Sequence, residues 1–390
     1  MTGLLDAALI DGDAAPELGA LAELCSLPRI GPARLRALLR DRSALDAIED
    51  LRCGNAETLA ALSACRGMDQ VLAATWQQRA SAAIAEAARS GRHVGADLLE
   101  AHARQSVWLH LPSRGRAAEL WETDPEPPAV LFGQGAPVDL SLRRVGIVGT
   151  RRCSAYGRTV ARLLGEGLAA EGVAVVSGLA TGIDGIAQRA ALDEGGPVIG
   201  VVGSGLDCVY PTANRALWAD VGEHGTLLSE YPLGTHPAPW QFPARNRIVA
   251  ALCELLIVVE SGPAGGSMYT VEAAVERDRT VMAVPGPITS NASSGTNRLL
   301  ADGCAPVCSV DDVLLALGAT GGGAAAATIA RPPDDPLERE LLDELTAGGR
   351  SVDELALCVD APLGDLATAL GRLQLSGWVS ETGGWWEKSR

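Results

Sequence analysis

The chain has 390 residues, of which 47% are hydrophobic, so it is long enough for two or three domains with buried cores. No stretch approaches about 18 uninterrupted apolar residues, and the first residues carry no basic region, so the sequence predicts neither a membrane span nor a secreted protein. The formal net charge of −16 argues against a generally basic nucleic-acid coat, but it allows a local basic surface, because salt screens exposed charges more than about 10 Å apart.

Residues 1–90 are predicted to form a helical domain of helix–hairpin–helix or SAM-like type. From residue 19 onward, Ala, Leu and Arg recur at helical spacing with almost no β-branched runs. Within this region, the segment CSLPRIGPARL (25–35) has the pattern of a hairpin whose backbone N–H groups face a phosphate. A plain packing turn between two helices has the same pattern, and both interpretations stay open.

Residues 91–316 are predicted to form an extended Rossmann-like domain. Pro125, Pro127 and Pro128 force an extended approach to the first strand. From residue 145 onward, strand and helix alternate five or six times, which is typical of βαβ units and a parallel sheet. The predicted fold class is therefore α/β, with a mostly parallel sheet between a small helical N-terminal domain and a winged-helix C-terminal domain.

The C-terminal part is predicted to be a flexible linker (317–336) followed by a winged-helix domain (337–390). Ser351 and Glu354 form a capping box that opens one helix, Pro362 starts the next, and a turn at 382–384 joins two short strands. Residues 331–390 hold six Lys/Arg against twelve Asp/Glu. A DNA groove reader needs more cations than this, so a protein-docking or structural module fits better.

Small polar residues follow the predicted strands, and in a parallel sheet the loops after strands gather at one edge. Glycines, hydroxyls and arginines that favour a bound anion occur in the first loop at Gly149, Thr150, Arg151 and Arg152, in the second at Ser177, Gly178 and Gly182, and in a third at Gly205. A Rossmann turn needs a glycine in any case, but it does not need two arginines. The sequence therefore predicts a wide phosphate-binding platform at this edge.

Two arginines also stand near the start of a predicted helix, at Arg245 and Arg247, with Asn246 between them. Cations normally suit the last turn of a helix rather than the first. Their position favours a bound anion over arginines that are merely solvated.

Catalysis finds little support in the sequence. None of the five histidines falls in the glycine-rich loops, and no serine-hydrolase elbow, zinc motif, P-loop or dinucleotide fingerprint occurs, so we expect no catalytic residue, no metal and no cofactor. The nine scattered cysteines form no CxxC pair, which is typical of reduced thiols in a cytoplasm.

The central region closely resembles the DprA family, also called Smf, of DNA-processing proteins. The resemblance covers roughly residues 105–316 and rests on EPPAVLFGQG (126–135), GTR (149–151) with Tyr156 and Gly157, SGLATGID (177–184), GSGLD (203–207) with Tyr210, Pro211 and Asn214, Ser229 and Glu230 with PLG (232–234), FPARNRIV (242–249), VPG (284–286) and GTN (295–297).

This resemblance implies a cytoplasmic, non-enzymatic protein that binds single-stranded DNA, protects incoming DNA and loads the recombinase RecA during natural transformation. It implies DNA contacts at the loop residues named above, at Arg245, Asn246 and Arg247, and at Gly266 and Ser267. It also implies a homodimer through the Rossmann domain and a RecA contact near Leu299 and Leu300. Of these two leucines, one is expected to face the core and the other a partner, although both could pack inward.

One segment departs from the family pattern. Ala264 stands where the family has a basic residue, which puts one phosphate contact in doubt. The same segment partly resembles LOG-type nucleotide hydrolases, because Gly265, Gly266 and Glu272 match their motif while Met268 and Tyr269 do not. A nucleotide N-glycosidic hydrolase with Glu272 as its carboxylate, and a nucleotide-sensing module on the same fold, are therefore the alternatives.

Overall fold

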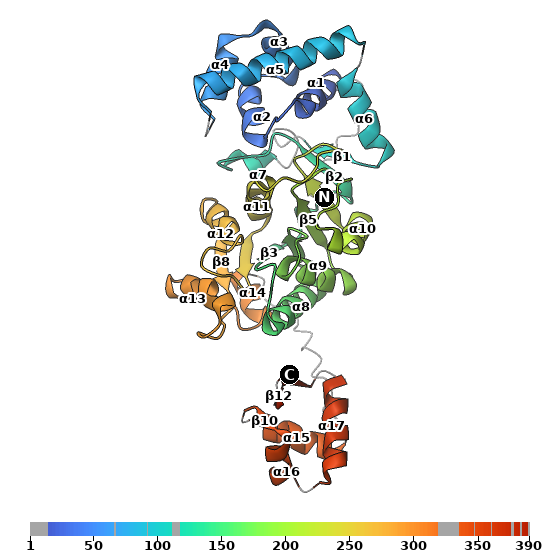
Figure 1. Ribbon diagram of the computed structural model, residues 1–390, viewed down its shortest axis with the longest axis vertical. Coiled ribbons are helices and arrows are strands. Elements are labelled where there is room, and N and C mark those ends of the chain that lie inside the picture. The colour runs from blue at the N-terminus through green and yellow to red at the C-terminus, as the bar shows by residue number, and fades with distance from the viewer. Residues whose placement is uncertain are drawn as a thin grey trace. The chain divides into compact units, whose positions relative to one another are not determined.

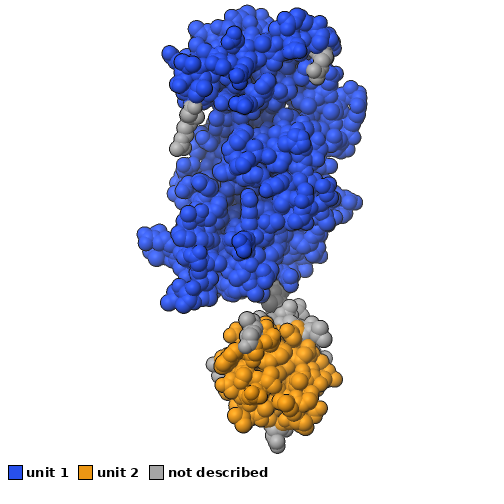
Figure 2. Space-filling model, viewed as in Figure 1, with its two compact units in different colours: residues 1–320 blue, residues 321–390 orange. Residues whose placement is uncertain are grey.

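The computed structural model describes residues 15–65, 68–91, 93–110, 118–318, 335–346, 348–359, 361–375, 378–382 and 384–388. The chain divides into two compact units, residues 1–320 and 321–390 (Figures 1 and 2). Most of the predicted linker, residues 319–334, lies outside the described residues. In the part that is described, no helix is long and apolar enough to cross a membrane.

The first unit begins with a helical layer made of α1 (Ala15–Ser26), α2 (Pro32–Leu39), α3 (Ala44–Cys53), α4 (Ala56–Ser63), α5 (Gln70–Arg89) and α6 (Val94–Arg104). Helix α6 packs against α1, and a Cβ at Gly95 would lie 2.0 Å from the carbonyl oxygen of Gly19. This close approach requires glycine, and it extends the helical layer from the predicted end at residue 90 to Arg104.

The segment between α1 and α2 packs onto its own layer. The indole N–H of Trp76 on α5 donates to the Pro28 carbonyl at 2.9 Å, and Gly31 precedes Pro32 at the start of α2. These contacts show that the turn between α1 and α2 packs against α5. Its predicted contact with DNA remains a prediction.

A nine-stranded sheet follows, in the order β1-β2-β6-β5-β4-β3-β7-β8-β9. Its strands are β1 (Trp108–His110), β2 (Leu131–Gly135), β3 (Arg144–Val148), β4 (Ala174–Ser177), β5 (Val198–Val202), β6 (Thr226–Ser229), β7 (Leu255–Val258), β8 (Thr280–Ala283) and β9 (Ala305–Pro306). Strands β3 to β9 pair in parallel, whereas β2 is antiparallel to both β1 and β6. The predicted mostly parallel α/β sheet is confirmed.

Helices cover both faces of this sheet. They are α7 (Ala118–Glu122), α8 (Ala155–Ala170), α9 (Ile183–Asp193), α10 (Arg215–His224), α11 (Gln241–Leu252), α12 (Met268–Val275), α13 (Ser294–Ala301) and α14 (Val310–Ala316), with 3₁₀ turns at Thr212–Asn214 and Asn291–Ser293. Along β3, Val145 and Ile147 face the core under α8, α9 and α10, while Val148 faces the core under α11 and α12. This alternation gives the sheet two buried faces.

The central strand β3 fixes where the sheet changes direction. Strands β4, β5 and β6 lie on one side of β3, and β7, β8 and β9 lie on the other. The helices after β3 and β7 therefore cover opposite faces, which separates the loops that lead to them. In open α/β sheets, ligands bind at this switch point.

The second unit has α15 (Pro336–Thr346), α16 (Val352–Cys358) and α17 (Leu363–Leu375), with a small sheet of β10 (Arg350–Ser351), β12 (Trp385–Lys388) and β11 (Val379–Thr382). The predicted capping box is present, because the Ser351 hydroxyl accepts from the Glu354 N–H while the Glu354 carboxylate accepts from the Ser351 N–H. Three helices and a hairpin confirm the winged-helix prediction.

Candidate nucleic-acid interface

The loops after β3 and β4 are joined at the sheet edge by contacts that only glycine allows. Gly182 has a φ of 82°, and a Cβ there would lie 2.3 Å from the Thr150 carbonyl oxygen. A Cβ at Gly149 would lie 2.6 Å from the Ile183 side chain and 2.8 Å from the Glu260 carbonyl oxygen. The space beside Gly149 and Gly182 is thus filled by the chain itself, so these glycines serve loop packing rather than leaving room for a phosphate.

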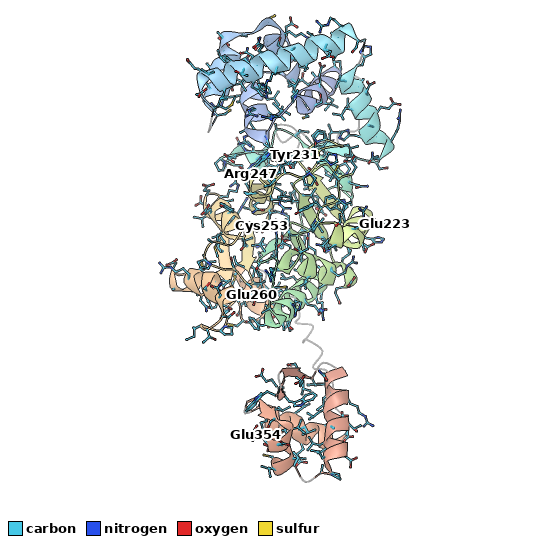
Figure 3. The ribbon with its side chains drawn as sticks, in the orientation of Figure 1. Glu223, Tyr231, Arg247, Cys253, Glu260 and Glu354 are labelled. Atoms are coloured by element: carbon cyan, nitrogen blue, oxygen red, sulfur yellow. The ribbon has the colours of Figure 1, made fainter. Side chains whose placement is uncertain are left out.

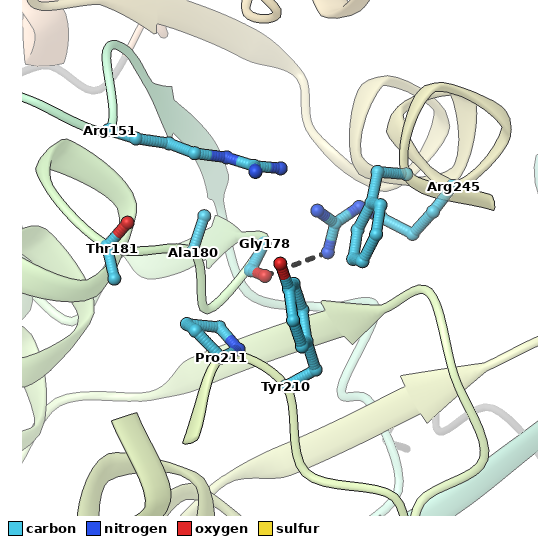
Figure 4. Close-up of a pocket in the computed structure, with 8 residues that line it drawn as sticks. Arg151, Gly178, Ala180, Thr181, Tyr210, Pro211 and Arg245 are labelled. Carbon is cyan, nitrogen blue, oxygen red and sulfur yellow. Dashed lines mark hydrogen bonds between the residues drawn. The ribbon is translucent and has the colours of Figure 1, made fainter. Parts of the chain in front are cut away.

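Beside these joined loops lies a hollow, which we call the edge pocket (Figure 4). It is lined by Arg151, Gly178, Ala180, Thr181, Tyr210, Pro211, Phe242 and Arg245. Three of the predicted site residues, Arg151, Gly178 and Arg245, come together here from separate loops and a helix. Sequence reasoning placed the other five lining residues only within motifs of the family resemblance and assigned none of them a DNA contact: Ala180, Thr181, Tyr210, Pro211 and Phe242.

Arg151 and two rings form the open side of the edge pocket. The Arg151 guanidinium lies 5.4 Å from the centre of the Phe242 ring, and the Tyr210 ring lies 5.2 Å from the same ring. Arg151 and Tyr210 are exposed, and none of the carboxylates that the structure describes forms an ion pair with Arg151. A cation without an ion pair among the described residues thus lies beside the exposed Tyr210 ring and the half-buried Phe242 ring.

Arg245 forms the floor of the edge pocket. Its guanidinium donates to the Gly178 carbonyl at 2.8 Å and to the Val201 carbonyl, and Figure 4 shows it directed toward the same space as Arg151. A Cβ at Gly178 would lie 2.5 Å from the guanidinium, so Gly178 provides the room for it. Burial lowers the pKa of Arg245 to about 10, against the opposing effect of buried Asp184, so the floor keeps its positive charge at neutral pH.

Arg247 points away from the edge pocket, although it stands two residues from Arg245. Its guanidinium forms ion pairs with buried Glu230 and, at 3.6 Å, with Glu126. Glu126 also pairs with Arg36 of the helical layer at 3.5 Å. Figure 3 shows Arg247 next to that layer. Its position near the helix start is therefore explained by carboxylates of the chain, and the geometry gives its predicted DNA contact no support.

The other predicted contact residues do not line the edge pocket. Arg152 is exposed on the loop after β3, and the hydroxyl of buried Ser177 donates to the Ile147 carbonyl. The Asn246 side chain donates to the Gly266 carbonyl at 3.3 Å. Gly205 and Ser267 are buried in loop packing: the Gly205 N–H donates to the Thr235 carbonyl, and the Ser267 hydroxyl donates to Ser261.

Glu272 bears on the hydrolase hypothesis, and Leu299 and Leu300 bear on the predicted partner contact. Glu272, the carboxylate of the hydrolase hypothesis, is exposed on α12 and does not line the edge pocket. Leu299 on α13 packs partly against the core under α11 and α12, whereas half-buried Leu300 belongs to none of the core clusters among the described residues. Within the same described residues, no group of three or more His, Cys, Asp or Glu side chains is placed to hold a metal ion.

Comparison with known proteins identifies two regions of the chain. Residues 112–318 match the family model described as DNA recombination-mediator protein A, and residues 325–384 match the DprA winged helix domain. The chain is 42% identical over 229 residues to the "Putative DNA processing protein DprA" of Mycobacterium tuberculosis, a match that covers 58% of this chain and 57% of that protein. The matched region thus spans little more than half of that relative.

A second relative is matched over more of its length. The chain is 35% identical over 271 residues to "Protein Smf" of Escherichia coli, which covers 67% of this chain and 72% of that protein. The X-ray structure of DprA from Streptococcus pneumoniae superposes with a TM-score of 0.58 at 30% identity, covering 76% of this chain and 95% of that one. The resemblance inferred from the sequence motifs is confirmed, and the chain belongs to the DprA family of DNA recombination-mediator proteins.

Proposed function

We propose that this protein binds single-stranded DNA through the edge pocket. The observation that carries the proposal is the exposed guanidinium of Arg151 beside the Phe242 and Tyr210 rings, above the buried cation of Arg245. In this proposal a backbone phosphate lies between the two guanidinium groups, and an unpaired base stacks on the exposed Tyr210 ring. In a duplex the bases already stack on one another, so this combination favours a single strand.

The role in the cell is the finer part of the proposal. Relatives carry the names of DNA-processing proteins, and the matching family model is described as a recombination mediator. We propose that the protein acts in the cytoplasm without catalysis, protects incoming single strands and delivers them to RecA during natural transformation. The acidic winged helix would then serve protein docking rather than DNA reading.

The binding proposal is tested by the salt dependence of affinity for a single-stranded oligonucleotide, a duplex and a mononucleotide. Affinity for the single strand should be highest, and it should fall as salt rises because bound phosphates release counterions. Phe242→Ala should weaken single-strand binding at every salt concentration, since stacking on a ring does not depend on counterions. Arg162→Ala removes an exposed arginine on α8 outside the edge pocket and is the matched control. Equal affinity for all three ligands would contradict the proposal.

The proposed homodimer is tested at α13. Leu300→Glu should give a folded monomer, because Leu300 lies outside the core clusters of the described residues. Leu299→Glu should instead destabilise the fold, because it places a charge against the core under α11 and α12. Sedimentation and denaturant unfolding of both variants separate these outcomes. A dimeric, stable Leu300→Glu variant would remove this segment from the interface.

A further inference from the structure

The start of α8 is the place where a sheet of this kind would hold the phosphate of a nucleotide. Helix α8 follows β3 directly at the switch point, and its 16 residues begin after Ser154. The N–H groups of a first helical turn have no partner within the helix and carry partial positive charge. Together these features make such a helix start an anion site in many α/β proteins.

In this chain a carboxylate already occupies that position. Glu260 follows β7, the strand next to β3, and only 1% of its surface is exposed. Its carboxylate accepts from the Ser154 N–H at 2.9 Å and from the Ser154 hydroxyl at 2.5 Å. The Ser154 hydroxyl in turn accepts from the Gly157 N–H at 3.0 Å.

The surroundings are shaped around this carboxylate. A Cβ at Gly157 would lie 2.3 Å from the nearer Glu260 carboxylate oxygen, so α8 lacks a side chain where Glu260 sits. The Thr150 N–H donates to the Glu260 carbonyl at 2.8 Å, which fixes the backbone on the other side. Among the described residues, no Lys, Arg or His forms an ion pair with Glu260, so hydrogen bonds at the helix start are its stabilising partners. Figure 3 shows Glu260 well apart from Arg247.

We propose that Glu260 is a built-in anion that closes the nucleotide-phosphate site of this fold and thereby makes the protein selective for DNA strands over free nucleotides. The inference rests on the proposed function, because a phosphate excluded from α8 is left with the edge pocket. There Arg151 and Arg245 come from different segments and would hold a backbone phosphate beside the exposed Tyr210 ring and the half-buried Phe242 ring. A mononucleotide then has no phosphate site at the start of α8 and makes only one phosphate contact in the edge pocket. A strand offers several phosphates and bases, so it can make more contacts.

The test removes the carboxylate and supplies anions from solution. Glu260→Ala leaves the N–H and the O–H of Ser154 without an acceptor, so inorganic phosphate and AMP should raise its melting temperature relative to sodium chloride of the same ionic strength. Each charge-assisted hydrogen bond regained corresponds to roughly a tenfold gain in affinity. The wild-type protein should gain much less from either anion, because only the single phosphate contact of the edge pocket is open to it. Glu260→Gln fills the same volume and should not respond, and Glu272→Ala, which removes an exposed carboxylate, should behave as wild type.

Single-strand affinity of Glu260→Ala, measured beside these anion effects, separates the two proposals. The inference expects it to stay within a few-fold of wild type while AMP binding appears. An AMP response equal in wild type and Glu260→Ala, or absent from both, would overturn the inference and leave the proposed function standing. Failure of the wild-type protein to bind single strands would instead overturn the proposed function.

A second variant covers the case in which Glu260→Ala is too unstable to assay. Gly157→Ala should lower the melting temperature of the wild-type protein, because the new Cβ displaces the carboxylate. In the Glu260→Ala background the same change should raise the melting temperature, because the methyl group fills vacated space and alanine favours a helix. This reversal of sign identifies contact between the two positions. A Gly157→Ala effect of the same sign in both backgrounds would refute the proposed geometry.

Discussion

Alanine at position 247 would leave the Glu230 carboxylate buried without its cation. The side chains of Arg247 and Glu230 are 7% and 4% exposed, so water cannot replace the lost partner. Removing one member of a buried ion pair costs about 3–5 kcal/mol of unfolding free energy, because the remaining charge stays desolvated. We expect a loss of this size for Arg247→Ala in a denaturant titration. Replacing both residues, as in Arg247→Met with Glu230→Leu, should recover most of it.

Arg151→Ala, compared with Arg247→Ala, separates an effect on DNA binding from an effect on stability. Arg151 is exposed and forms no ion pair with a carboxylate of the described chain, so its removal should change stability by only about 0.5 kcal/mol. If Arg151 contacts one phosphate, the slope of log affinity against log salt should fall by about 0.7 for a single strand. Arg247→Ala, assayed where it remains folded, should keep the wild-type slope.

Two results would contradict these assignments of a stabilising role to Arg247 and a DNA-binding role to Arg151. A stable Arg247→Ala variant with a reduced salt slope would show that the Arg247 guanidinium leaves Glu230 to meet DNA. An Arg151→Ala variant with an unchanged slope and affinity would remove the exposed cation from the proposed interface. Arg162→Ala again controls for the general loss of one positive charge.

Three further outcomes follow from described contacts. Burial lowers the pKa of His102 from its ordinary value of 6.5, although its hydrogen bond to Leu98 opposes this shift. As the pH falls below 6.5, the unfolded chain therefore takes up a proton that the folded chain does not, and the unfolding free energy should decrease from its value at higher pH. His102→Gln should flatten this part of the pH profile. Gly178→Ala should displace the Arg245 guanidinium, lower unfolding free energy by about 1.5–3 kcal/mol and weaken single-strand binding, measured by titration of the same sample. Deleting residues 335–390 should leave single-strand affinity within a few-fold, and a loss of about a hundredfold would assign DNA contacts to the winged helix.

Much of the sheet could be predicted from the sequence, because alternating strands and helices after residue 145 allow little other than a parallel arrangement. The antiparallel edge formed by β1 and β2 was not foreseen. Strand β1 has three residues, and its pairing with β2 depends on a partner more than 20 positions away, which local periodicity does not reveal.

The candidate site was predictable only in part. The loops that carry Arg151 and Gly178 had to meet at one edge of a parallel sheet, and they do. Successive helix positions turn by about 100°, so Arg245 and Arg247 lie roughly 200° apart and could not face one surface. The sequence contained that information, but the carboxylates that receive Arg247 come from distant segments. Likewise, a glycine that admits a ligand and one that admits a neighbouring loop look identical in sequence.

The charges that join the helical layer to the sheet have a consequence for the design of chimeras between members of the family. Arg36 of α2 and Arg247 of α11 share Glu126, and Arg247 also holds Glu230. The helical layer is therefore linked to the sheet domain through this shared carboxylate. A chimera that takes its first 104 residues from another member of the family inherits whatever stands at position 36, and its fit depends on whether that side chain suits a carboxylate it did not evolve with.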